Sequence, residues 1–204
     1  MDYRKLKSGS DVRGVAVGEG ATLTPDVAKT LGMAFARYVA GKTGKPVERV
    51  SIALGRDSRV SGPQLLEAAA QGIASAGAKA VDYGMCTTPA MYMAILTDGF
   101  RPDGSIMVTA SHHPWQLNGL KFFTAEGGLG FHELDEVLDL ASKMTNPFYQ
   151  GIFLYRAAKL YYYKNDEENC RKLLSEAMEK LKGTAWEVMI RQMLEENLAL
   201  VAER

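Results

Sequence analysis

Residues 105–114, SIMVTASHHP, join an apolar run to a polar turn. The apolar part, residues 105–109, predicts a β-strand that ends just before Ser111. In open α/β sheets, ligands bind in the crevice outside the carboxyl ends of the strands. We therefore expect this stretch to be a strand of an α/β sheet whose following turn presents Ser111 in a crevice.

Strands and helices alternate on both sides of this stretch. Further strands are predicted at 50–54 and 80–83, and helices from Pro25 towards Gly41, from a Ser61 cap to Gly77, from Thr87 onwards, and at 133–143. Strands separated by helices indicate a layered α/β sheet. Residues 120–123 follow the strand at 105–109 too closely for a helical crossover. We therefore expect these two strands to pair antiparallel, which makes the sheet mixed.

The glycine content divides the chain near residue 145. Residues 1–144 hold 18 of the 20 glycines, whereas residues 145–204 hold only two. Pro147 marks the junction, because a proline disfavours a helical conformation at the residue before it. We expect two domains: an α/β domain at 1–144 and a small all-α domain of helical-hairpin type at 145–204.

Apolar residues in the second part follow the spacing of a 34-residue tetratricopeptide repeat. The matching positions are Ala157, Ala158, Tyr161, Cys170, Leu174 and Ala177. Residues 164–167 would be the turn between two helices, and residues 186–201 a third, amphipathic helix that caps the pair. Residues 148–204 thus resemble one degenerate repeat, with an ordinary helical hairpin as an equal alternative. We expect some exposed apolar surface, which would support self-association or a protein partner.

Composition argues against several classes of partner. The chain holds 24 basic and 24 acidic residues, so it has no net charge with which to hold a nucleic acid or an anionic membrane surface. No apolar run is long enough to suggest a membrane span, and the N-terminus lacks the apolar segment of a signal peptide. We expect a cytoplasmic protein whose two cysteines, Cys86 and Cys170, form neither a disulfide framework nor a zinc site.

Ser111 has a histidine neighbour, which raises the hypothesis of a Ser-His-Asp hydrolase. His112 follows Ser111 directly, however, and adjacent side chains in extended backbone point to opposite faces. A hydrolase is therefore a weak interpretation. Taken alone, residues 109–114 are better explained as a turn whose polar side chains bond the local backbone.

The turn belongs to a series of five motifs. They are SGSDVRG at 8–14, GRDSR at 55–59, GMCTTP at 84–89, TASHHP at 109–114 and NGLK at 118–121. In this order and at about this spacing, residues 1–144 resemble the first domain of the α-D-phosphohexomutases, the phosphoglucomutase/phosphomannomutase family. Five motifs in register are far more specific than any one of them. The family usually has asparagine where His113 stands, whereas Ser111, His112 and Pro114 match it.

The resemblance implies a role for each matching residue. Ser111 would carry a phosphoryl group that it gives to a hexose phosphate and regains from the bisphosphorylated sugar. Arg13 and Lys121 would neutralise the transferring group and help to move the hydroxyl proton, and His112 would give a supporting contact. These roles suit phosphoryl transfer, which depends mainly on positioning and on cations that stabilise spread negative charge.

Each of these side chains has a plainer alternative. Arg13 could form a surface ion pair with Asp11, Lys121 could be a solvated strand residue, and His112 could be an ordinary turn histidine. The register of the five motifs favours the functional role in each case.

Further residues of the motifs are expected to support the site. Arg56, Asp57 and Arg59 would hold the active loop through a charge network, and Asn118 would support the site from the last motif. Residues 87–89 are expected only to start a helix. Three apolar side chains near the motifs are expected to serve only packing: Met91, Met93 and Trp115.

The resemblance also implies a magnesium ion. In the family, the ion is held by the phosphoserine, here Ser111, together with an Asp-Gly-Asp-Gly-Asp loop that this sequence lacks. One oxygen ligand cannot define a Mg²⁺ site, because the ion requires near-octahedral oxygen coordination. The family's sugar-recognition and phosphate-binding loops are absent as well, so we expect the chain alone to lack mutase activity. The competing hypothesis is a non-catalytic binding module whose helical part contacts another protein.

Overall fold

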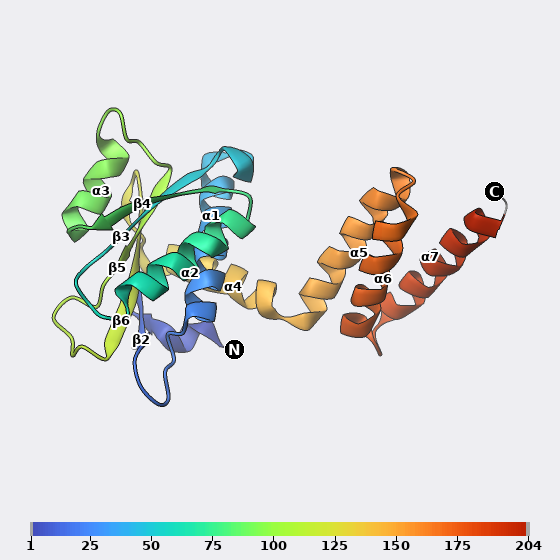
Figure 1. Cartoon of the computed structure of the whole chain (residues 1–204), viewed down its shortest axis with the longest axis horizontal. Coiled ribbons are helices and arrows are strands. Elements are labelled where there is room, and N and C mark those ends of the chain that lie inside the picture. Colours follow the sequence, from blue (N-terminus) through green and yellow to red (C-terminus); the bar gives the residue numbers. More distant parts are fainter. Residues whose placement is uncertain (1, 203–204) are drawn as a thin grey trace. The chain divides into compact units, whose positions relative to one another are not determined.

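The computed structural model describes residues 2–202, and it describes side chains for residues 2–195 (Figure 1). The chain divides into two compact units, Met1–Ser142 and Lys143–Arg204. The first unit combines helices with a mixed seven-stranded sheet, and the second consists of helices. The predicted α/β class with a mixed sheet, followed by a helical part, is confirmed.

Seven strands form the sheet of the first unit. Along the chain they are β1 (Lys7–Ser8), β2 (Asp11–Val15), β3 (Ser51–Arg56), β4 (Lys79–Met85), β5 (Gly104–Val108), β6 (Leu117–Thr124) and β7 (Gly127–Gly128). Their spatial order is β1-β2-β6-β5-β3-β4, and β7 pairs with β6. β3 runs parallel to β4 and β5, whereas β6 runs antiparallel to β2 and β5. The predicted antiparallel pairing is confirmed, since Leu120 lies opposite Val108.

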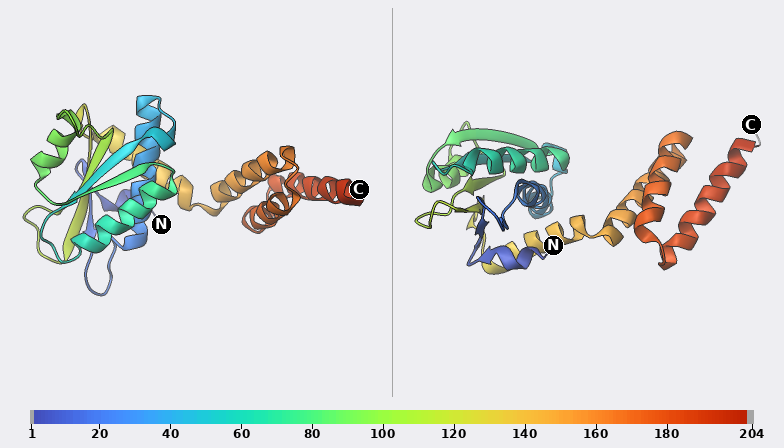
Figure 2. Two further views of the ribbon diagram at one scale, coloured as in Figure 1. Left: turned by 45° about the horizontal axis from the view of Figure 1, so that its top comes forward. Right: turned by 60° about the horizontal axis from the view of Figure 1, so that its bottom comes forward.

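Helices cover both faces of the sheet. The first unit contains α1 (Pro25–Thr43), α2 (Gly62–Ser75), α3 (Thr88–Leu96) and most of α4 (Phe131–Thr145), with short 3-10 helices at Tyr3–Leu6 and Val47–Arg49. The Phe122 ring of β6 lies 5.0 Å from Phe35 of α1, and the Phe123 ring lies 6.2 Å from Tyr92 of α3. Neighbouring strand residues face opposite sides, so α1 and α3 lie on opposite faces. Figures 1 and 2 show α2 beside α1.

Two of the predicted helices begin at a threonine side-chain cap. The Thr24 hydroxyl accepts a hydrogen bond from the Val27 N–H, and the Thr87 hydroxyl accepts one from the Ala90 N–H, each at 3.4 Å. The end of α1 differs from the expectation, because the helix passes Gly41 and stops only before Gly44, whose φ is 66°. A left-handed glycine is the common end of a helix.

The predicted Ser61 cap is wrong in its side-chain role. Ser61 does precede α2, but its hydroxyl makes no capping bond. Instead it accepts a hydrogen bond from the Asn118 side-chain amide of β6, at 2.9 Å, inside the protein. A tertiary partner has replaced the local one, and Asn118 therefore joins β6 to the start of α2.

A polar network joins the start of α4 to α1. One carboxylate oxygen of Glu133 accepts from the Lys42 ammonium at 2.9 Å and from the Tyr38 hydroxyl at 3.0 Å, and the other accepts from the Gly130 N–H at 2.9 Å. These donors, the Gly130 N–H foremost, lower the pKa of Glu133 to about 2. Burial and the same carboxylate raise the pKa of Tyr38 to about 12.

We expect Glu133→Gln to lower the free energy of unfolding near neutral pH by about 1 kcal/mol, since this pair is partly solvated. The folded-state pKa of Glu133 is depressed, so the unfolded chain takes up the proton first as the pH falls. The stabilisation is complete above the ordinary pKa of 4.5 and is lost as the pH falls towards 2. Urea unfolding of both proteins at about pH 7 and about pH 2.5 should show the gap closing in acid. A gap of the same size at both values would contradict this prediction.

The second unit is built from three helices, α5 (Pro147–Tyr163), α6 (Glu167–Leu181) and α7 (Ala185–Ala202). The Asn146 side chain caps α5 by accepting from the Phe148 N–H at 2.9 Å, and Asp166 caps α6 by accepting from the Asn169 N–H at 3.2 Å. The predicted turn between the first two helices is confirmed. Among the described residues, no helix is both long enough and apolar enough to cross a membrane.

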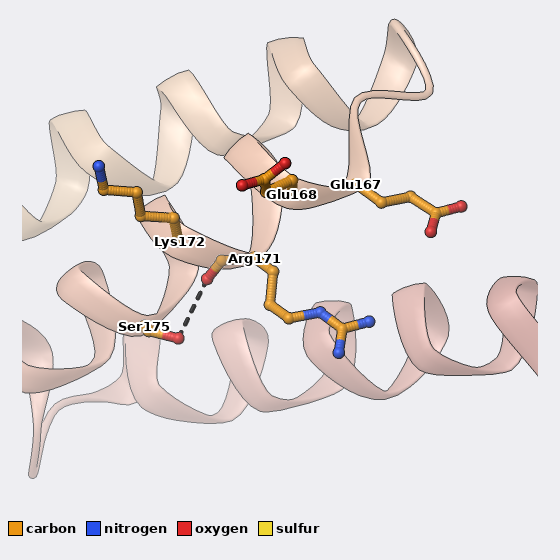
Figure 3. A pocket seen from close by; sticks show the side chains of 5 residues that line it. All are labelled: Glu167, Glu168, Arg171, Lys172 and Ser175. Atoms are coloured by element: carbon orange, nitrogen blue, oxygen red, sulfur yellow. Dashed lines mark hydrogen bonds between the residues drawn. The ribbon is translucent and has the colours of Figure 1, made fainter.

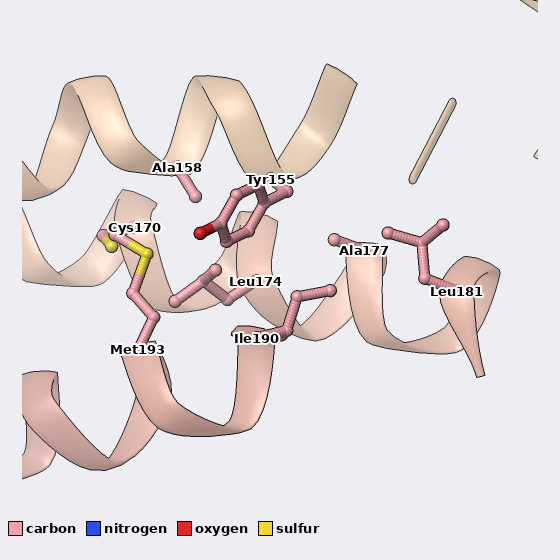
Figure 4. Close-up of a cluster of buried hydrophobic side chains, with 8 residues drawn as sticks. All are labelled: Tyr155, Ala158, Cys170, Leu174, Ala177, Leu181, Ile190 and Met193. Carbon is pink, nitrogen blue, oxygen red and sulfur yellow. The ribbon is translucent and has the colours of Figure 1, made fainter. Parts of the chain in front are cut away.

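The three helices share one apolar core (Figure 4). Its buried members are Tyr155, Ala158, Cys170, Leu174, Ala177, Leu181, Ile190 and Met193. Most positions of the repeat pattern are buried here, and Tyr161 is partly buried against them. Such burial suits a tetratricopeptide repeat and an ordinary hairpin equally, so both stay predictions.

Several large side chains of this unit remain exposed. They are Phe153, Leu160, Tyr163, Val188 and Met189. Some exposed apolar surface is therefore present, as expected. Self-association through it, or binding of a protein partner, stays a prediction. Part of the predicted third helix, at residues 196–201, lies outside the described side chains.

Candidate functional site

The turn that follows β5 has an unusual backbone at Ser111. Its φ is 57°, in the left-handed region that residues other than glycine seldom adopt. The Ser111 N–H donates to the Thr109 hydroxyl at 2.9 Å, and the His113 N–H donates to the Ala110 carbonyl at 3.2 Å. Residues held in such a conformation cost about 1–3 kcal/mol and persist only where surrounding bonds fix them. The result is an exposed Ser111 side chain at the carboxyl end of the strand.

His112 lies closer to Ser111 than extended backbone would allow. The Ser111 Oγ and the His112 Nδ1 are 3.3 Å apart. The expectation that the two side chains point to opposite faces is therefore wrong, because the left-handed residue breaks the alternation of a strand. Among residues 2–195, no carboxylate is hydrogen-bonded to His112, so the geometry still does not form a Ser-His-Asp triad.

Arg59, in the loop after β3, holds the turn by its backbone. Its guanidinium donates to four carbonyls: Ser111 and His113 at 2.7 Å, Pro114 at 2.8 Å and Leu117 at 3.0 Å. The Arg59 side chain is only 11% exposed. Bonds from an ionised donor are about twice as strong as neutral ones, so this side chain fixes the whole turn.

Asp57 connects Arg59 to the end of β5. One carboxylate oxygen accepts from the Thr109 hydroxyl at 2.6 Å and lies 3.3 Å from the Arg59 Nε. The other carboxylate oxygen accepts from the backbone N–H of Arg59 at 3.0 Å. Thr109 in turn accepts from the Ser111 N–H, so a continuous series of bonds joins Arg59 to Ser111. Arg56, by contrast, donates only to the Asp57 carbonyl within the described residues, at 3.1 Å.

Arg13 of β2 and Lys121 of β6 meet at one carboxylate. The same Asp11 oxygen accepts from the Arg13 Nη2 at 3.0 Å and from the Lys121 Nζ at 2.6 Å. The Arg13 Nη1 lies 2.7 Å from the His113 Nε2, which brings Arg13 against the Ser111 turn. The alternative of an Arg13–Asp11 ion pair is thus present, but it is largely buried rather than on the surface, with Asp11 10% exposed.

Burial has the largest effect on the pKa of the His113 ring. Together with the positive charge of Arg13, and with His112 and Arg59, it lowers the pKa of His113. The His113 ring also stacks on the His112 ring, with centroids 5.0 Å apart. These neighbours favour a neutral His113.

Sequence reasoning assigned no site role to three residues that belong to the site: Thr109, His113 and Asp11, which it named only as a surface ion-pair partner of Arg13. Period-two alternation could have found Asp11 and Thr109, because Asp11 and Arg13 are two residues apart on one strand and share a face. Thr109 likewise stands two residues before Ser111. The sequence carries no comparable signal for His113, whose partner Arg13 lies 100 positions away.

Comparison with known proteins identifies the family of the first unit. Residues 4–145 match the family model described as phosphoglucomutase/phosphomannomutase, alpha/beta/alpha domain I. This chain belongs to the phosphoglucomutase/phosphomannomutase family. The resemblance found in the five sequence motifs is confirmed.

Individual relatives of this phosphohexomutase-family chain support the same family assignment. A phosphoglucosamine mutase of Mycobacterium leprae is 43% identical over 125 residues, which are 61% of this chain and 25% of that protein. One of Clostridium acetobutylicum is 38% identical over 141 residues, 69% of this chain and 29% of that protein. The crystal structure of a family protein from Burkholderia thailandensis superimposes with a TM-score of 0.60 at 32% identity, over 70% of this chain and 31% of that chain. The chain thus matches between a quarter and a third of the length of these relatives.

The side chains of this phosphohexomutase domain do not complete a magnesium site. Among the described residues, no group of three or more histidine, cysteine, aspartate or glutamate side chains comes together to hold a metal ion. The Asp11 carboxylate already accepts hydrogen bonds from the side chains of Arg13 and Lys121. Magnesium prefers about six oxygen ligands, so Ser111 alone does not fit the ion.

The packing roles expected near the motifs hold only in part. Met91 is fully buried and packs with Ala53 and Met107, as predicted. Trp115 is 60% exposed and Met93 is 52% exposed, so the burial of these two side chains does not support the packing role predicted for them. Trp115 lies in the turn that Arg59 holds by its backbone, and a turn fixed in this way does not need to bury its side chains.

A hollow in the helical unit provides no second site. It measures about 540 Å³ and is lined by Glu167, Glu168, Arg171, Lys172 and Ser175 of α6 (Figure 3). The Ser175 hydroxyl donates to the Arg171 carbonyl of its own helix at 3.0 Å. Two acidic residues are followed by two basic residues along this helix, and such mixed charge is typical of a solvated surface.

Proposed function

We propose that the first unit is the phosphoserine domain of a phosphohexomutase. In this proposal, Ser111 takes a phosphoryl group from a hexose bisphosphate and gives it to a hexose monophosphate. One observation carries the proposal: an exposed Ser111 stands in a turn that Arg59 fixes through four carbonyls. Membership of the family and similarity to proteins named phosphoglucosamine mutase support the class of substrate. The proposal includes a cytoplasmic location for this activity.

The transfer itself is a substitution at phosphorus. The Ser111 Oγ forms a bond to phosphorus, the bond from phosphorus to the sugar oxygen breaks, and the serine proton leaves with the sugar oxygen as its final acceptor. His112 Nδ1, 3.3 Å from the Ser111 Oγ, orients the hydroxyl. Arg13 and Lys121 supply positive charge for the negative charge that spreads over the transferring group. Reaction at a fixed serine needs positioning more than a strong base.

We expect Ser111→Ala to abolish covalent phosphorylation without unfolding the domain. The wild-type chain is incubated with glucose 1,6-bisphosphate, and phosphate is located by intact mass and phosphopeptide mapping. We expect one phosphate on Ser111 in the wild type and none in the variant. An exposed turn serine contributes little to packing, so the free energy of unfolding should change by about 0.5 kcal/mol or less.

The matched control is Ser175→Ala, which removes a serine hydroxyl from the helical unit and should leave the phosphate in place. Phosphate mapped to another residue, or a wild-type chain that takes up none, would refute the proposal.

A further inference from the structure

Arg13 is held at both of its terminal nitrogens. Its Nη2 donates to Asp11 at 3.0 Å, and its Nη1 lies 2.7 Å from the His113 Nε2. A guanidinium can only donate hydrogen bonds, and it stays protonated in proteins. The His113 Nε2 must therefore be the acceptor, so the proton of the neutral ring is on Nδ1.

His113 is itself fixed to the Ser111 turn. Its N–H donates to the Ala110 carbonyl at 3.2 Å, and its carbonyl accepts from the Arg59 Nη2 at 2.7 Å. Its ring lies nearly parallel to the His112 ring, at an interplanar angle of 18°. Because the His113 backbone is held at its N–H and its carbonyl and its ring stacks on His112, the residue gives Arg13 a fixed acceptor.

We infer that His113 is a positioning residue, which holds Arg13 beside the turn so that its positive charge faces the group transferred to Ser111. The inference rests on the proposed function. Asp11 fixes one end of the guanidinium from β2, and His113 fixes the other end from the turn. Without His113, the Asp11 contact still holds one nitrogen, but the guanidinium can rotate about that contact. Small misplacements of a charged group cost large factors in rate, which explains why a second anchor matters.

The contact is tested first by the tautomer of His113. Long-range ¹⁵N NMR on the histidines of the wild-type chain identifies which ring nitrogen carries the proton, and the His113 signals are assigned by their loss in His113→Asn. We expect the Nδ1–H tautomer in the wild type and a mixture of tautomers in Arg13→Met. A wild-type His113 that carries its proton on Nε2 would overturn the inference, whether or not Ser111 is phosphorylated.

The role is tested by the rate of Ser111 phosphorylation with glucose 1,6-bisphosphate. We expect His113→Leu to slow the reaction at least about tenfold, and His113→Asn to recover most of it, because the asparagine Oδ1 also accepts a hydrogen bond. A residue that only supported the fold would not be rescued in this way. The matched control is His132→Asn, the third histidine, exposed on α4, which should react at the wild-type rate.

The two proposals fail in different ways. If His113→Leu takes up phosphate as fast as the wild type, the inference is wrong and the proposed function stands. Circular dichroism checks that His113→Leu and His113→Asn are both folded. If they are folded and His113→Asn reacts as slowly as His113→Leu, the acceptor role is wrong. If the wild type takes up no phosphate, the proposed function fails, and the positioning role fails with it.

Discussion

Arg59→Met is expected to slow the phosphorylation of Ser111 about a hundredfold and to lower the free energy of unfolding of the first unit by about 3 kcal/mol. The guanidinium supplies four hydrogen bonds to the carbonyls of residues 111–117. Methionine keeps much of the apolar stem but donates to none of them. The partly buried carboxylate of Asp57, which is 26% exposed, also loses its cation, and this adds to the loss of stability.

The loss of rate follows from the backbone of Ser111. A left-handed serine is held in place by the bonds around it, and the Arg59 contact to its carbonyl is one of these. Once the turn relaxes to an ordinary conformation, the hydroxyl loses its position beside the His112 Nδ1. Urea unfolding measures the stability, and mass spectrometry with glucose 1,6-bisphosphate measures the rate.

Two further variants sharpen this result. Arg59→Lys keeps the charge but cannot reproduce the planar fork, so we expect an intermediate loss of rate. Arg56→Met removes the same type of side chain three positions earlier, where the guanidinium donates only to the Asp57 carbonyl within the described residues, and we expect a much smaller loss. Equal effects of Arg59→Met and Arg56→Met would show that the four carbonyl bonds do not hold the turn.

Gly72→Ala is expected to lower the free energy of unfolding by about 3 kcal/mol or more, at the upper end of overpacking effects. A Cβ at Gly72 of α2 would lie 1.8 Å from the Lys29 carbonyl oxygen of α1. On the facing helix, a Cβ at Gly32 would lie 2.3 Å from the Ala69 carbonyl oxygen. Backbone cannot move aside as a flexible side chain can, so the two helices must separate. Urea unfolding, monitored by circular dichroism, measures the loss.

Gly41→Ala is the matched control for this prediction. Gly41 also lies in α1, but a Cβ there would meet nothing within 4 Å. Alanine is preferred to glycine inside a helix by about 0.5–1 kcal/mol, so this variant should be slightly more stable than the wild type. An equal loss of stability in both variants would show that the close approach of the two helices at Gly72 does not decide the effect.

The sequence by itself determined those features that short stretches of chain decide. The starts of α1 and α3 follow from the threonine caps at Thr24 and Thr87, which act over three residues. The antiparallel pairing of β6 with β5 follows from a connection too short for a crossover helix. The five motifs also sufficed to name the family, since their order and spacing can be read from the sequence alone.

Local rules failed where a distant partner replaced the nearby one. The Ser61 hydroxyl accepts a bond from Asn118, 57 positions away, instead of capping α2. The Ser111 backbone turns left-handed where its carbonyl accepts from Arg59, 52 positions away, and its N–H donates to the Thr109 hydroxyl. This conformation brings the His112 ring to the Ser111 hydroxyl. Neither outcome can be read from a window of a few residues.

Only the tertiary structure decided which groups form the site. Arg59 reaches the Ser111 carbonyl across 52 positions because β3 and β5 are parallel neighbours in the sheet, so the loops that follow them emerge side by side. Asp11 meets Lys121 across 110 positions because β2 and β6 pair antiparallel. The motifs indicated which residues matter, but the strand order, which comes from packing the whole sheet, determined what each side chain bonds. A hydrogen bond requires an approach within about 3 Å, and only the folded sheet sets distances that small between remote residues.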